Sequence, residues 1–383
     1  MDINRFDKSF PGKLVVIDDG RGVAFVPNPL PSNWELPPAL VKKWAEAKEV
    51  LGELRGTARM LKDPTLLLRP LEQREALRSS RLEGTYATPE EMLAYELNPR
   101  SPQSSDDPAN AWREVFNYQR ALDLGRVLVD KNVPFSERLI RQMHNRLLAG
   151  VRGEDKNPGN LRKTQVHVGI GRRFTPAPPG ELQKLLSQFD QSLQQQTNID
   201  PLIRSLMVHY QIETIHPFRD GNGRVGRLLL ALMIYKYCGF EKPWLYLSEF
   251  FENHKDEYIE ALFNVSAKGD WTRWIELGLL ATIESGRKTV ERVRKLLILR
   301  EEYENRIREH SGRDRLMHAI PLMLSHPIIT YQDLMKALDV TYPTARGDMV
   351  ALIDMEIVKD LPGVHRPRLF VAHEIFALAY SDD

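Results

Sequence analysis

The chain has 383 residues, of which 42% are hydrophobic and 27% are charged, a composition typical of a globular protein with a sizeable buried core. Its formal net charge of +1 gives no general attraction for nucleic acid or for an acidic membrane surface. The single cysteine, Cys238, excludes an intramolecular disulfide and suits a reducing compartment. Because the N-terminus lacks an apolar signal-peptide core and no stretch of roughly 18 uncharged apolar residues follows, we expect a cytoplasmic protein without a membrane segment.

The first region, residues 1–108, combines strand and helix patterns. The segment 14–27 (LVVIDDGRGVAFVP) favours a short pair of strands. Helical segments are expected from about 38 to 97, and one of them, at about 70–84 (PLEQREALRSSRLEG), has a proline at its start and a glycine at its end. Residues 98–110 (NPRSPQSSDDPAN) have no periodic apolar pattern and predict a linker or an exposed loop.

The central region, residues 109–285, is expected to be almost entirely helical, because its apolar residues recur at spacings of three and four. Ser136 and the pair Asp200-Pro201 are typical of helix starts. The main exception is 165–180 (QVHVGIGRRFTPAPPG), where alternation, β-branched residues and glycine predict a short hairpin followed by prolines that forbid helix. This hairpin should project as a flap.

A charged helix at 286–311 is expected to link the central region to a last unit, residues 312–383. The order of helix, turn, helix, a turn at Pro362-Gly363 and strand in this unit suggests a winged helix-turn-helix. The predicted fold class is therefore mainly α, in three parts. It comprises an all-helical core with a small β-hairpin flap, a helical N-terminal segment and a C-terminal winged helix.

The segment with the clearest chemical pattern is 216–227 (HPFRDGNGRVGR), a loop between two predicted helices. Gly221, Asn222 and Gly223 permit backbone angles that are closed to most residues. Their N–H groups can therefore converge into a concave nest at the positive end of the next helix, and such a nest binds phosphate.

Charged side chains stand on both sides of this glycine-rich turn. Arg224 and Arg227 lie three apart in the first turn of the following helix, where the helix dipole disfavours cations unless a polyanion binds there. Asp220 offers a hard oxygen ligand for Mg²⁺ shared with phosphate oxygens, and His216 offers a general base for a hydroxyl nucleophile. Singly, each residue is explained by a cap or a solvated face, but the set together indicates a phosphate-handling site.

This segment resembles the signature of the Fic family, which reads His, any residue, Phe, any residue, Asp or Glu, Gly, Asn, Gly, Arg, any two residues, Arg. The fixed positions are all matched, by His216, Phe218, Asp220, Gly221, Asn222, Gly223, Arg224 and Arg227. The surrounding segments 143–150 (MHNRLLAG) and 157–169 (NPGNLRKTQVHVG) also resemble Fic domains. The resemblance is strong from about 112 to 285 and looser in the flanking parts.

The resemblance implies a protein adenylyltransferase, an enzyme that transfers AMP from ATP to Ser, Thr or Tyr hydroxyls of target proteins and of itself. His216 would deprotonate the hydroxyl, which attacks the α-phosphate and expels pyrophosphate. Asp220 would hold Mg²⁺ (or Mn²⁺) on the α- and β-phosphates. The turn 221–223 would stabilise charge on the α-phosphate, while Arg224 and Arg227 would hold the β- and γ-phosphates.

Further binding residues are expected outside the signature. Asn253 and Tyr258 could line the adenine pocket, although an Asn and a Tyr in an amphipathic helix also serve as cap and core. The predicted flap could accept a target segment as an added strand, or it could be a structural cover for the pocket. The flap residues concerned are Val166, His167, Val168 and Gly169.

An inhibitory segment is expected ahead of the central region. Ser79 and Glu83 lie four apart on one face of a predicted helix, and the string SSRLEG, which ends at Gly84, resembles the Fic inhibitory motif of Ser or Thr, three residues, Glu, and Gly or Asn. The carboxylate of Glu83 could pair bidentately with Arg227 and take the γ-phosphate position, so that ATP binds badly or without in-line geometry. The alternative is that Glu83 is one of many surface carboxylates.

Other functions stay open on the sequence alone. Fic relatives also transfer other phosphate-containing groups or remove AMP, and the Fic block could instead sense nucleotide for a DNA-binding winged helix. Residues 312–383 hold 7 Lys and Arg against 10 Asp and Glu, whereas a DNA reader should be basic, so protein interaction is favoured over DNA binding. A symmetric homodimer that buries the inhibitory segment is a further hypothesis.

Overall fold

The computed structural model describes residues 1–17, 20, 22–61, 63, 65–151, 157–310, 312–361 and 367–381. Within these residues the chain is mostly helical with small antiparallel sheets, which confirms the mainly α fold class. The helices up to the end of the central region are α1 (Pro38–Arg59), α2 (Thr65–Leu82), α3 (Pro89–Leu97), α4 (Ala109–Asp130), α5 (Glu137–Leu147), α6 (Leu182–Gln194), α7 (Pro201–Ile215), α8 (Asn222–Tyr237), α9 (Ser248–Asn253), α10 (Lys255–Lys268) and α11 (Trp271–His310). Short 3-10 helices are η1 (Ile3–Arg5), η4 (Ile170–Arg172), η5 (Pro179–Glu181) and η6 (Asp314–His318).

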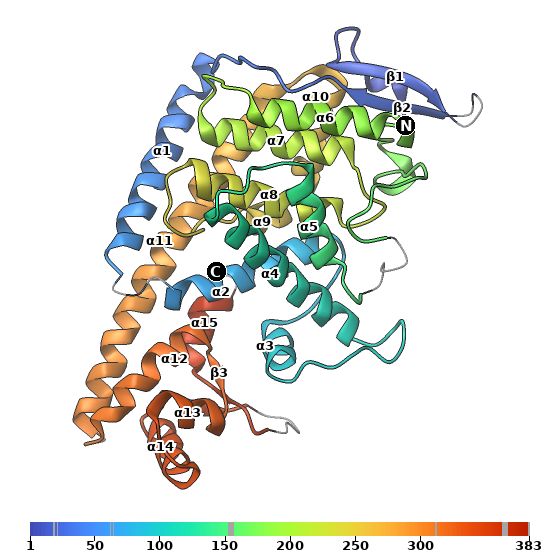
Figure 1. The fold of residues 1–383 in the computed structure, drawn as a ribbon. Helices are drawn as coiled ribbons and strands as arrows, with labels where there is room; N and C mark the ends of the chain where they lie inside the picture. Colours follow the sequence, from blue (N-terminus) through green and yellow to red (C-terminus); the bar gives the residue numbers. More distant parts are fainter. Residues whose placement is uncertain are drawn as a thin grey trace.

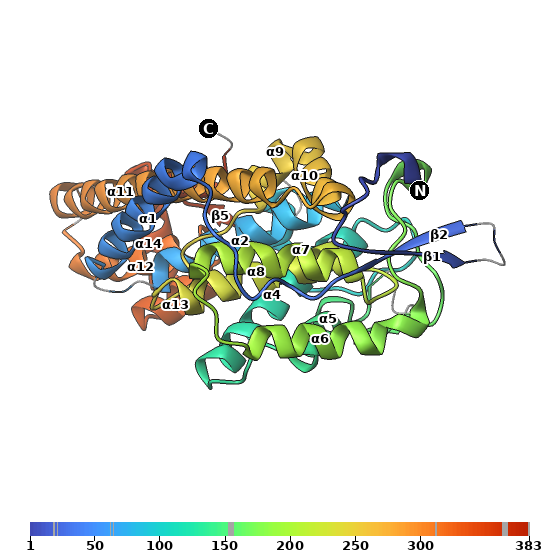
Figure 2. The same ribbon diagram turned by 90° about the horizontal axis from the view of Figure 1, so that it is seen from above.

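The core is built around the neighbouring helices α7 and α8, which are buried along nearly their whole length. Figure 2 shows the two helices between α6 on one side and α10 and α11 on the other. A helix that is apolar on every face has to be surrounded by other elements, which explains why these two lie at the centre. The loop that joins them, residues 216–221, is therefore held inside the protein.

Both predicted helix-start signals are confirmed. The side chain of Asp200 accepts a hydrogen bond from the Leu202 amide at 2.9 Å, and Pro201 is the first residue of α7. The Ser136 hydroxyl accepts from the Leu139 amide at 3.4 Å at the start of α5. Each cap satisfies an amide that has no partner within its helix.

The helix expected at about 70–84 starts earlier and ends slightly earlier than predicted. Helix α2 runs Thr65–Leu82 with Pro70 inside it, because Leu67 and Leu68 are buried and extend the helix before the proline. A proline so near the first turn removes a single intrahelical hydrogen bond, so packing overrides it. Figure 1 shows α2 crossing the middle of the molecule, and it packs against α4, α9 and α12.

The expected boundary between residues 285 and 286 falls inside one continuous helix, α11, which spans Trp271–His310. Buried apolar residues such as Ile283 and Val290 continue the same stripe across that point, so nothing interrupts the helix. Helix α11 runs beside α1 and carries the C-terminal unit at its far end (Figure 1). The other predicted domain boundaries stay predictions.

The C-terminal unit packs on α2 through its first and last helices. Strand β3 precedes a helix, a turn and a second helix, and β4 and β5 follow them, in the sheet order β3–β5–β4 with both pairings antiparallel. Its identification as a winged helix stays a prediction, and the turn at Pro362-Gly363 lies outside the described residues. The elements are α12 (Ala319–Ser325), β3 (Ile328–Ile329), α13 (Tyr331–Leu338), α14 (Tyr342–Asp354), β4 (Lys359–Asp360), β5 (Phe370–Val371) and α15 (His373–Tyr380).

The flap is smaller than the expected hairpin. A single antiparallel bridge joins Val168 to Phe174, because Gly169 and Gly171 turn the chain at φ angles of 78° and 68° directly after Val168. The predicted N-terminal strand pair is present as β1 (Gly12–Ile17) and β2 (Gly22–Pro27), and the Phe25 amide of β2 donates to the Thr175 carbonyl at 2.9 Å. Among the described helices, none combines the length and the apolar character needed to cross a membrane.

Candidate active site

The loop after α7 begins with His216 in the left-handed conformation, with φ 51° and ψ 60°. Its Nδ1 lies 3.1 Å from the Glu213 carbonyl oxygen. Because a carbonyl can only accept, Nδ1 carries the proton, and Nε2 is left as the unprotonated nitrogen. The His216 side chain lines a cavity of about 190 Å³.

Arg162 holds this loop from the side of the flap. Its Nε donates to the His216 carbonyl at 2.8 Å, and its backbone amide donates to the Pro217 carbonyl at 3.0 Å. The same guanidinium donates to the carbonyls of Thr164 and Ala177 in the flap segment. The side chain is buried, and burial lowers the pKa of Arg162 to about 10. Arg162 thus ties the backbone of His216 to the flap segment.

The middle of the loop is closed by Asn222. Its side chain accepts from the Phe218 amide and donates to the Phe218 carbonyl, both at 2.9 Å. The Phe218 ring is buried and stacks on His144 with centroids 3.7 Å apart. His144 Nδ1 accepts from the Gly159 amide at 2.9 Å, so its Nε2 is the protonated nitrogen and donates to the Asp220 carbonyl at 2.8 Å.

The glycine-rich turn forms the start of α8. Gly221 has φ 74°, a left-handed angle that favours glycine, and its amide donates to Asp220 Oδ1 at 2.7 Å. A Cβ atom at Gly223 would lie 2.9 Å from Arg227 Nη1 and still closer to the Glu83 carboxylate. Gly221 is thus required by its backbone conformation, and Gly223 by the close approach of Arg227 and Glu83. The amides of the turn lie at the positive end of α8.

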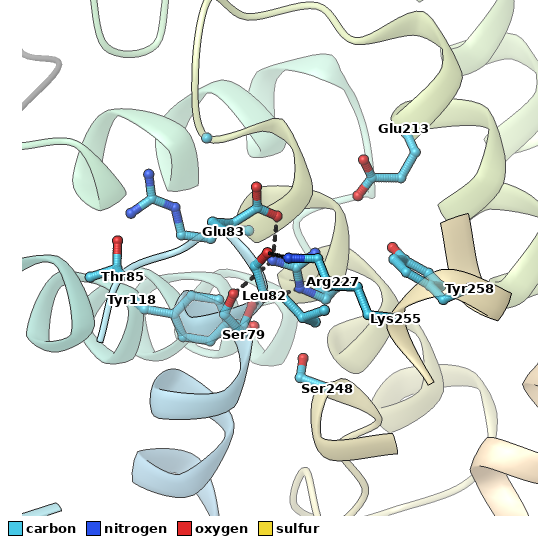
Figure 3. A network of polar contacts seen from close by, with 12 residues as sticks. Ser79, Leu82, Glu83, Thr85, Tyr118, Glu213, Arg227, Ser248, Lys255 and Tyr258 are labelled. Carbon is cyan, nitrogen blue, oxygen red and sulfur yellow. Dashed lines mark hydrogen bonds and ion pairs between the residues drawn. The ribbon is translucent and has the colours of Figure 1, made fainter. Parts of the chain in front are cut away.

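The two arginines of α8 have different partners. Arg224 is buried and donates from Nη1 to Glu114 Oε2 at 3.0 Å, and the same oxygen accepts from the Thr85 hydroxyl at 2.6 Å. Arg227 is also buried and points to the end of α2, as Figure 3 shows. Only Arg227 of the two therefore contacts the expected inhibitory segment.

The end of α2 meets Arg227 through three hydrogen bonds. Arg227 Nε donates to the Ser79 hydroxyl and Nη2 donates to the Ser79 carbonyl and to Glu83 Oε1, each at 2.8 Å (Figure 3). Burial alone would raise the pKa of Glu83, but the charge and hydrogen bond of Arg227 hold that pKa below its usual value. The Glu83 carboxylate is therefore ionised at neutral pH, and its side chain is 38% exposed.

The backbone after Leu82 explains why a glycine follows the glutamate. The Thr85 amide donates to the Ser80 carbonyl and the Gly84 amide donates to the Arg81 carbonyl, both at 3.0 Å, and Gly84 has φ 84°. This is a Schellman helix end, in which glycine takes the left-handed position. Glu83 is thus the residue directly after α2, and its side chain extends from the helix end to Arg227.

The cavity beside His216 brings together seven of the residues expected from the sequence, namely Glu83, Val168, Gly169, His216, Gly223, Arg227 and Tyr258. Its polar wall includes Glu83, Gly223 and Arg227, and the flap residues Val168 and Gly169 line the opposite part. Tyr258 lines it as well, with its hydroxyl 2.8 Å from His209 Nε2. The apolar part of the remaining lining is Leu82, Phe174, Ile259, Leu262 and Phe263, and its polar part is Arg173, Glu213, Thr214, Lys255 and Ser266.

Nine residues expected at the site do not line this cavity, namely Ser79, Gly84, Val166, His167, Asp220, Gly221, Asn222, Arg224 and Asn253. Asn253, the last residue of α9, is exposed and does not line the cavity. Val166 and His167 also lie outside the lining, and the His167 ring contacts the Thr175 hydroxyl at 3.1 Å. The structure thus separates Asn253 from Tyr258 and the first two flap residues from the last two.

Sequence reasoning missed two side chains of the cavity. Glu213 lines it, and its Oε1 is buried without a hydrogen-bond partner among the described residues. Burial raises the pKa of Glu213 to about 7. Lys255 also lines the cavity and donates to the Leu82 carbonyl at 2.7 Å, at the end of α2. The position of Glu213 three residues before His216 was the only sequence signal for it, and Lys255 had none.

The electrostatics keep His216 neutral. Burial, together with the nearby positive charge of Arg162, lowers the pKa of His216 to about 4. The imidazole is therefore unprotonated throughout the neutral pH range and can accept a proton at Nε2. Bound phosphate groups, being negative, would raise this pKa toward the working pH.

The fold and site together define a helical protein that places a histidine beside a glycine-rich helix start. Family models match the chain in two consecutive parts, "Fic/DOC family N-terminal" at residues 41–126 and "Fic/DOC family" at residues 134–234. The chain therefore contains a Fic/DOC N-terminal region followed by a Fic/DOC domain. This confirms the resemblance carried by the segment 216–227.

Curated relatives match parts of the chain. Protein adenylyltransferase fic-1 of Caenorhabditis elegans is 39% identical over 97 residues, which are 25% of this chain and 18% of that protein. Protein adenylyltransferase Fic of Culex quinquefasciatus is 35% identical over 160 residues, which are 41% of this chain and 30% of that protein. The chain thus matches less than a third of the length of these two relatives.

Solved structures share the fold. A Fic family protein from Desulfovibrio desulfuricans G20 aligns with 89% of this chain and 98% of its own, with a TM-score of 0.58 and 22% identity. A fragment of Fic-1 from C. elegans aligns with 66% of this chain and 74% of its own, with a TM-score of 0.54 and 23% identity. The first alignment extends the likeness well beyond the part that the family models match.

Proposed function

We propose that this protein is an adenylyltransferase that moves AMP from ATP to a Ser, Thr or Tyr hydroxyl of a target protein. The observation that carries the proposal is one cavity lined by His216, Gly223 and Arg227, with a phosphate-accepting turn at the start of α8. The relatives named protein adenylyltransferase support the same reaction.

His216 is the general base of the proposed reaction. Its neutral Nε2 takes the proton of the target hydroxyl as the hydroxyl oxygen bonds to the α-phosphorus of ATP. The bond from the α-phosphorus to the bridging oxygen breaks, and pyrophosphate leaves with that electron pair. The amides of the 221–223 turn and the guanidinium of Arg224 stabilise the negative charge of the phosphates.

Asp220 fits a role as the protein ligand of Mg²⁺ (or Mn²⁺). Its side chain is 34% exposed and stands beside the phosphate-accepting turn, and a carboxylate oxygen is the ligand that these ions prefer. No group of three or more His, Cys, Asp or Glu in the described residues could hold a metal alone, so phosphate oxygens would supply the other ligands. The bound ion would neutralise charge on the α- and β-phosphates.

Glu83 is the inhibitory residue of the proposal. Its carboxylate is a negative group on Arg227, which is the position that a terminal phosphate of ATP would take. ATP and Glu83 compete for the same guanidinium, so the enzyme is inhibited until Glu83 leaves. Ser79 supports this arrangement by accepting from Arg227 Nε.

The flap is the proposed docking strand for the target. Val168 exchanges two hydrogen bonds with Phe174, at 2.8 and 3.0 Å, and both Val168 and Gly169 line the cavity beside His216. An extended target segment added along residues 166–169 would place its hydroxyl next to Nε2. The target protein remains defined only by this hydroxyl and an extended backbone.

The test is transfer of label from α-³²P-ATP to protein, with Mg²⁺ and with cell lysate. Wild type, Glu83→Gly and Glu83→Gly/His216→Ala are compared. We expect weak labelling of protein by wild type, strong labelling by Glu83→Gly and none by the double variant. Absence of labelling by all three, with ATP binding intact, would contradict the transferase.

A further inference from the structure

The C-terminal end of α2, directly before the inhibitory carboxylate, is held by the short junction between α9 and α10. Glu252, at the end of α9, accepts from the buried Arg78 at 2.9 Å and lies 3.5 Å from Arg81. Lys255, the first residue of α10, donates from Nζ to the Leu82 carbonyl at 2.7 Å. The junction therefore contacts the end of α2 both through side-chain charge and through the backbone.

The contact between Lys255 and Leu82 has an electrostatic reason. The last carbonyls of a helix have no partner within it and form the negative end of the helix dipole. Backbone amides satisfy the Ser80 and Arg81 carbonyls in the Schellman end, and the Leu82 carbonyl accepts from Lys255. The dipole of α10 disfavours a cation at its own first residue, so the favourable field at Lys255 comes from α2 and not from α10.

The same lysine belongs to the cavity beside His216. Lys255 lines that cavity next to Leu82 and Glu83, and its side chain reaches from the start of α10 to the end of α2 (Figure 3). The side chain is exposed, and within the described residues the Leu82 carbonyl is its sole hydrogen-bond acceptor. Lys255 therefore has one structural contact, and that contact is with the residue preceding Glu83.

We propose that Lys255 is a positioning residue of the inhibitory segment. The Leu82 carbonyl belongs to the planar peptide that joins Leu82 to Glu83, so holding its oxygen holds the Glu83 backbone. Glu83 has a single hydrogen bond to Arg227, of 2.8 Å, and a shift of about 1 Å carries it beyond hydrogen-bond range. The inference rests on the proposed inhibition by Glu83 and adds the residue that keeps Glu83 in place.

The affinity of the full chain for ATP tests the proposal. Lys255→Met removes the cation and keeps the length of the side chain. We expect ATP with Mg²⁺ to bind about fivefold more tightly than to wild type in calorimetric titration, because Glu83 competes less well for Arg227. Lys255→Arg, which can still donate to the carbonyl, should behave as wild type.

Lys268→Met is the matched control. Lys268 is an exposed lysine at the other end of α10 and does not line the cavity, so ATP affinity should stay within about twofold of wild type. Tightening of ATP binding by Lys268→Met as large as that by Lys255→Met would mean that any loss of positive charge from α10 has this effect, and the proposal would be wrong.

Lys255→Met in the Glu83→Gly background separates positioning from nucleotide binding. With Glu83 absent there is nothing to position, so the Kd for ATP should change by less than about twofold. Binding about tenfold weaker in this background, without tightening when Glu83 is present, would make Lys255 a nucleotide ligand and overturn the proposal. If Glu83→Gly tightens ATP binding and Lys255→Met does not, only this inference fails, whereas no effect of Glu83→Gly contradicts the proposed inhibition itself.

Hydrogen exchange tests the positioning without nucleotide. The amides of Gly84 and Thr85 donate to carbonyls of α2 in the Schellman end. They should exchange about fivefold faster in Lys255→Met than in wild type, because the end of the helix opens more often, and at the wild-type rate in Lys268→Met. Equal exchange in wild type and Lys255→Met would overturn the proposal, since the end of α2 would then be held without the lysine.

Discussion

The loop at 216–223 and the end of α2 face each other across one cavity but are held in different ways. The loop is fixed by hydrogen bonds to its backbone from the buried side chains of His144, Arg162 and Asn222. Glu83 touches Arg227 through one carboxylate oxygen and is 38% exposed. Several buried side chains thus hold the loop, whereas the Glu83 contact depends on one exposed side chain.

The largest effect is expected when the loop itself is opened. Asn222→Ala removes both hydrogen bonds to the Phe218 backbone and leaves a buried amide and carbonyl unpaired. The free energy of unfolding should fall by about 2–4 kcal/mol, and the transfer rate by about a hundredfold because His216 is no longer held in place. Urea denaturation and ³²P labelling in the Glu83→Gly background measure the two quantities.

Asn253→Ala is the matched control for Asn222→Ala. This exposed asparagine ends α9, so its removal should change the free energy of unfolding by no more than about 0.5 kcal/mol. The KM for ATP of the same variant tests the adenine-pocket role predicted from the sequence. Equal loss of stability in both variants would show that the loop is not specially fixed.

A smaller effect is expected when only the inhibitory charge is removed. Glu83→Gln keeps the shape of the side chain but ends the competition with phosphate for Arg227. We expect ATP to bind about 10–100-fold more tightly, since a charge-assisted hydrogen bond no longer has to be broken. Calorimetric titration with ATP and Mg²⁺ gives the affinity, and an unchanged Kd would mean that Glu83 does not occupy the phosphate position.

The neutral state of His216 predicts that the difference in unfolding free energy between wild type and His216→Ala depends on pH. The pKa of about 4 in the folded protein lies below the ordinary value near 6.5, so the unfolded state binds the proton first as the pH falls. Compared with His216→Ala, wild type should lose about 1.4 kcal/mol of stability per pH unit between roughly 6.5 and 4. Raised-pKa carboxyls such as Glu75 are present in both proteins and cancel in the comparison.

Urea midpoints of wild type and His216→Ala at several pH values give this difference. A gap that stays constant with pH would mean that His216 is not desolvated in the folded protein. The rate of AMP transfer, measured at the same pH values, should be retained at neutral pH and lost only in acid.

The smallest effect is expected at Ser79. Ser79→Ala removes the hydroxyl that accepts from Arg227 Nε, while the Ser79 carbonyl and Glu83 still bind Nη2. The inhibited state should weaken by about 1 kcal/mol, which raises basal labelling about fivefold. Labelling as strong as in Glu83→Gly would instead make Ser79 the main inhibitory contact.

Much of the fold could be predicted from local patterns, and the failures have physical causes. Helix spacing and the caps at Ser136 and Asp200 gave correct helices because these signals act within one or two turns. The start of α2 was misplaced because burial of Leu67 and Leu68 outweighed Pro70, and α11 continued past residue 285 because its packed face did not change. Packing between distant segments is invisible in a local pattern.

The candidate site divides in the same way. The loop residues and the inhibitory motif were predicted by type and spacing. The Glu83–Arg227 ion pair is present, but it consists of one hydrogen bond from Nη2 to Oε1 and not of the bidentate pair that was expected, because Arg227 Nε bonds the Ser79 hydroxyl. Arg162, His144 and Lys255 were missed because each acts through a partner far away in the chain, and Glu213 was missed because its burial is set by tertiary packing. Sequence also placed Asn253 at the cavity, where only Tyr258 is found.

The sequence by itself determined the chemistry of the site. Its histidine, carboxylate, glycine-rich turn and two arginines all lie within twelve residues. One short loop and the helix start after it therefore bring them together, whatever the rest of the fold. Only the tertiary structure decided which arginine meets Glu83, which side chains fix the loop backbone, and that Lys255 meets the end of α2. The Glu83–Arg227 and Leu82–Lys255 contacts join segments more than a hundred residues apart, and Arg162 and His144 reach the loop from 54 and 76 residues away. Burial of apolar surface sets these approaches for the whole chain at once.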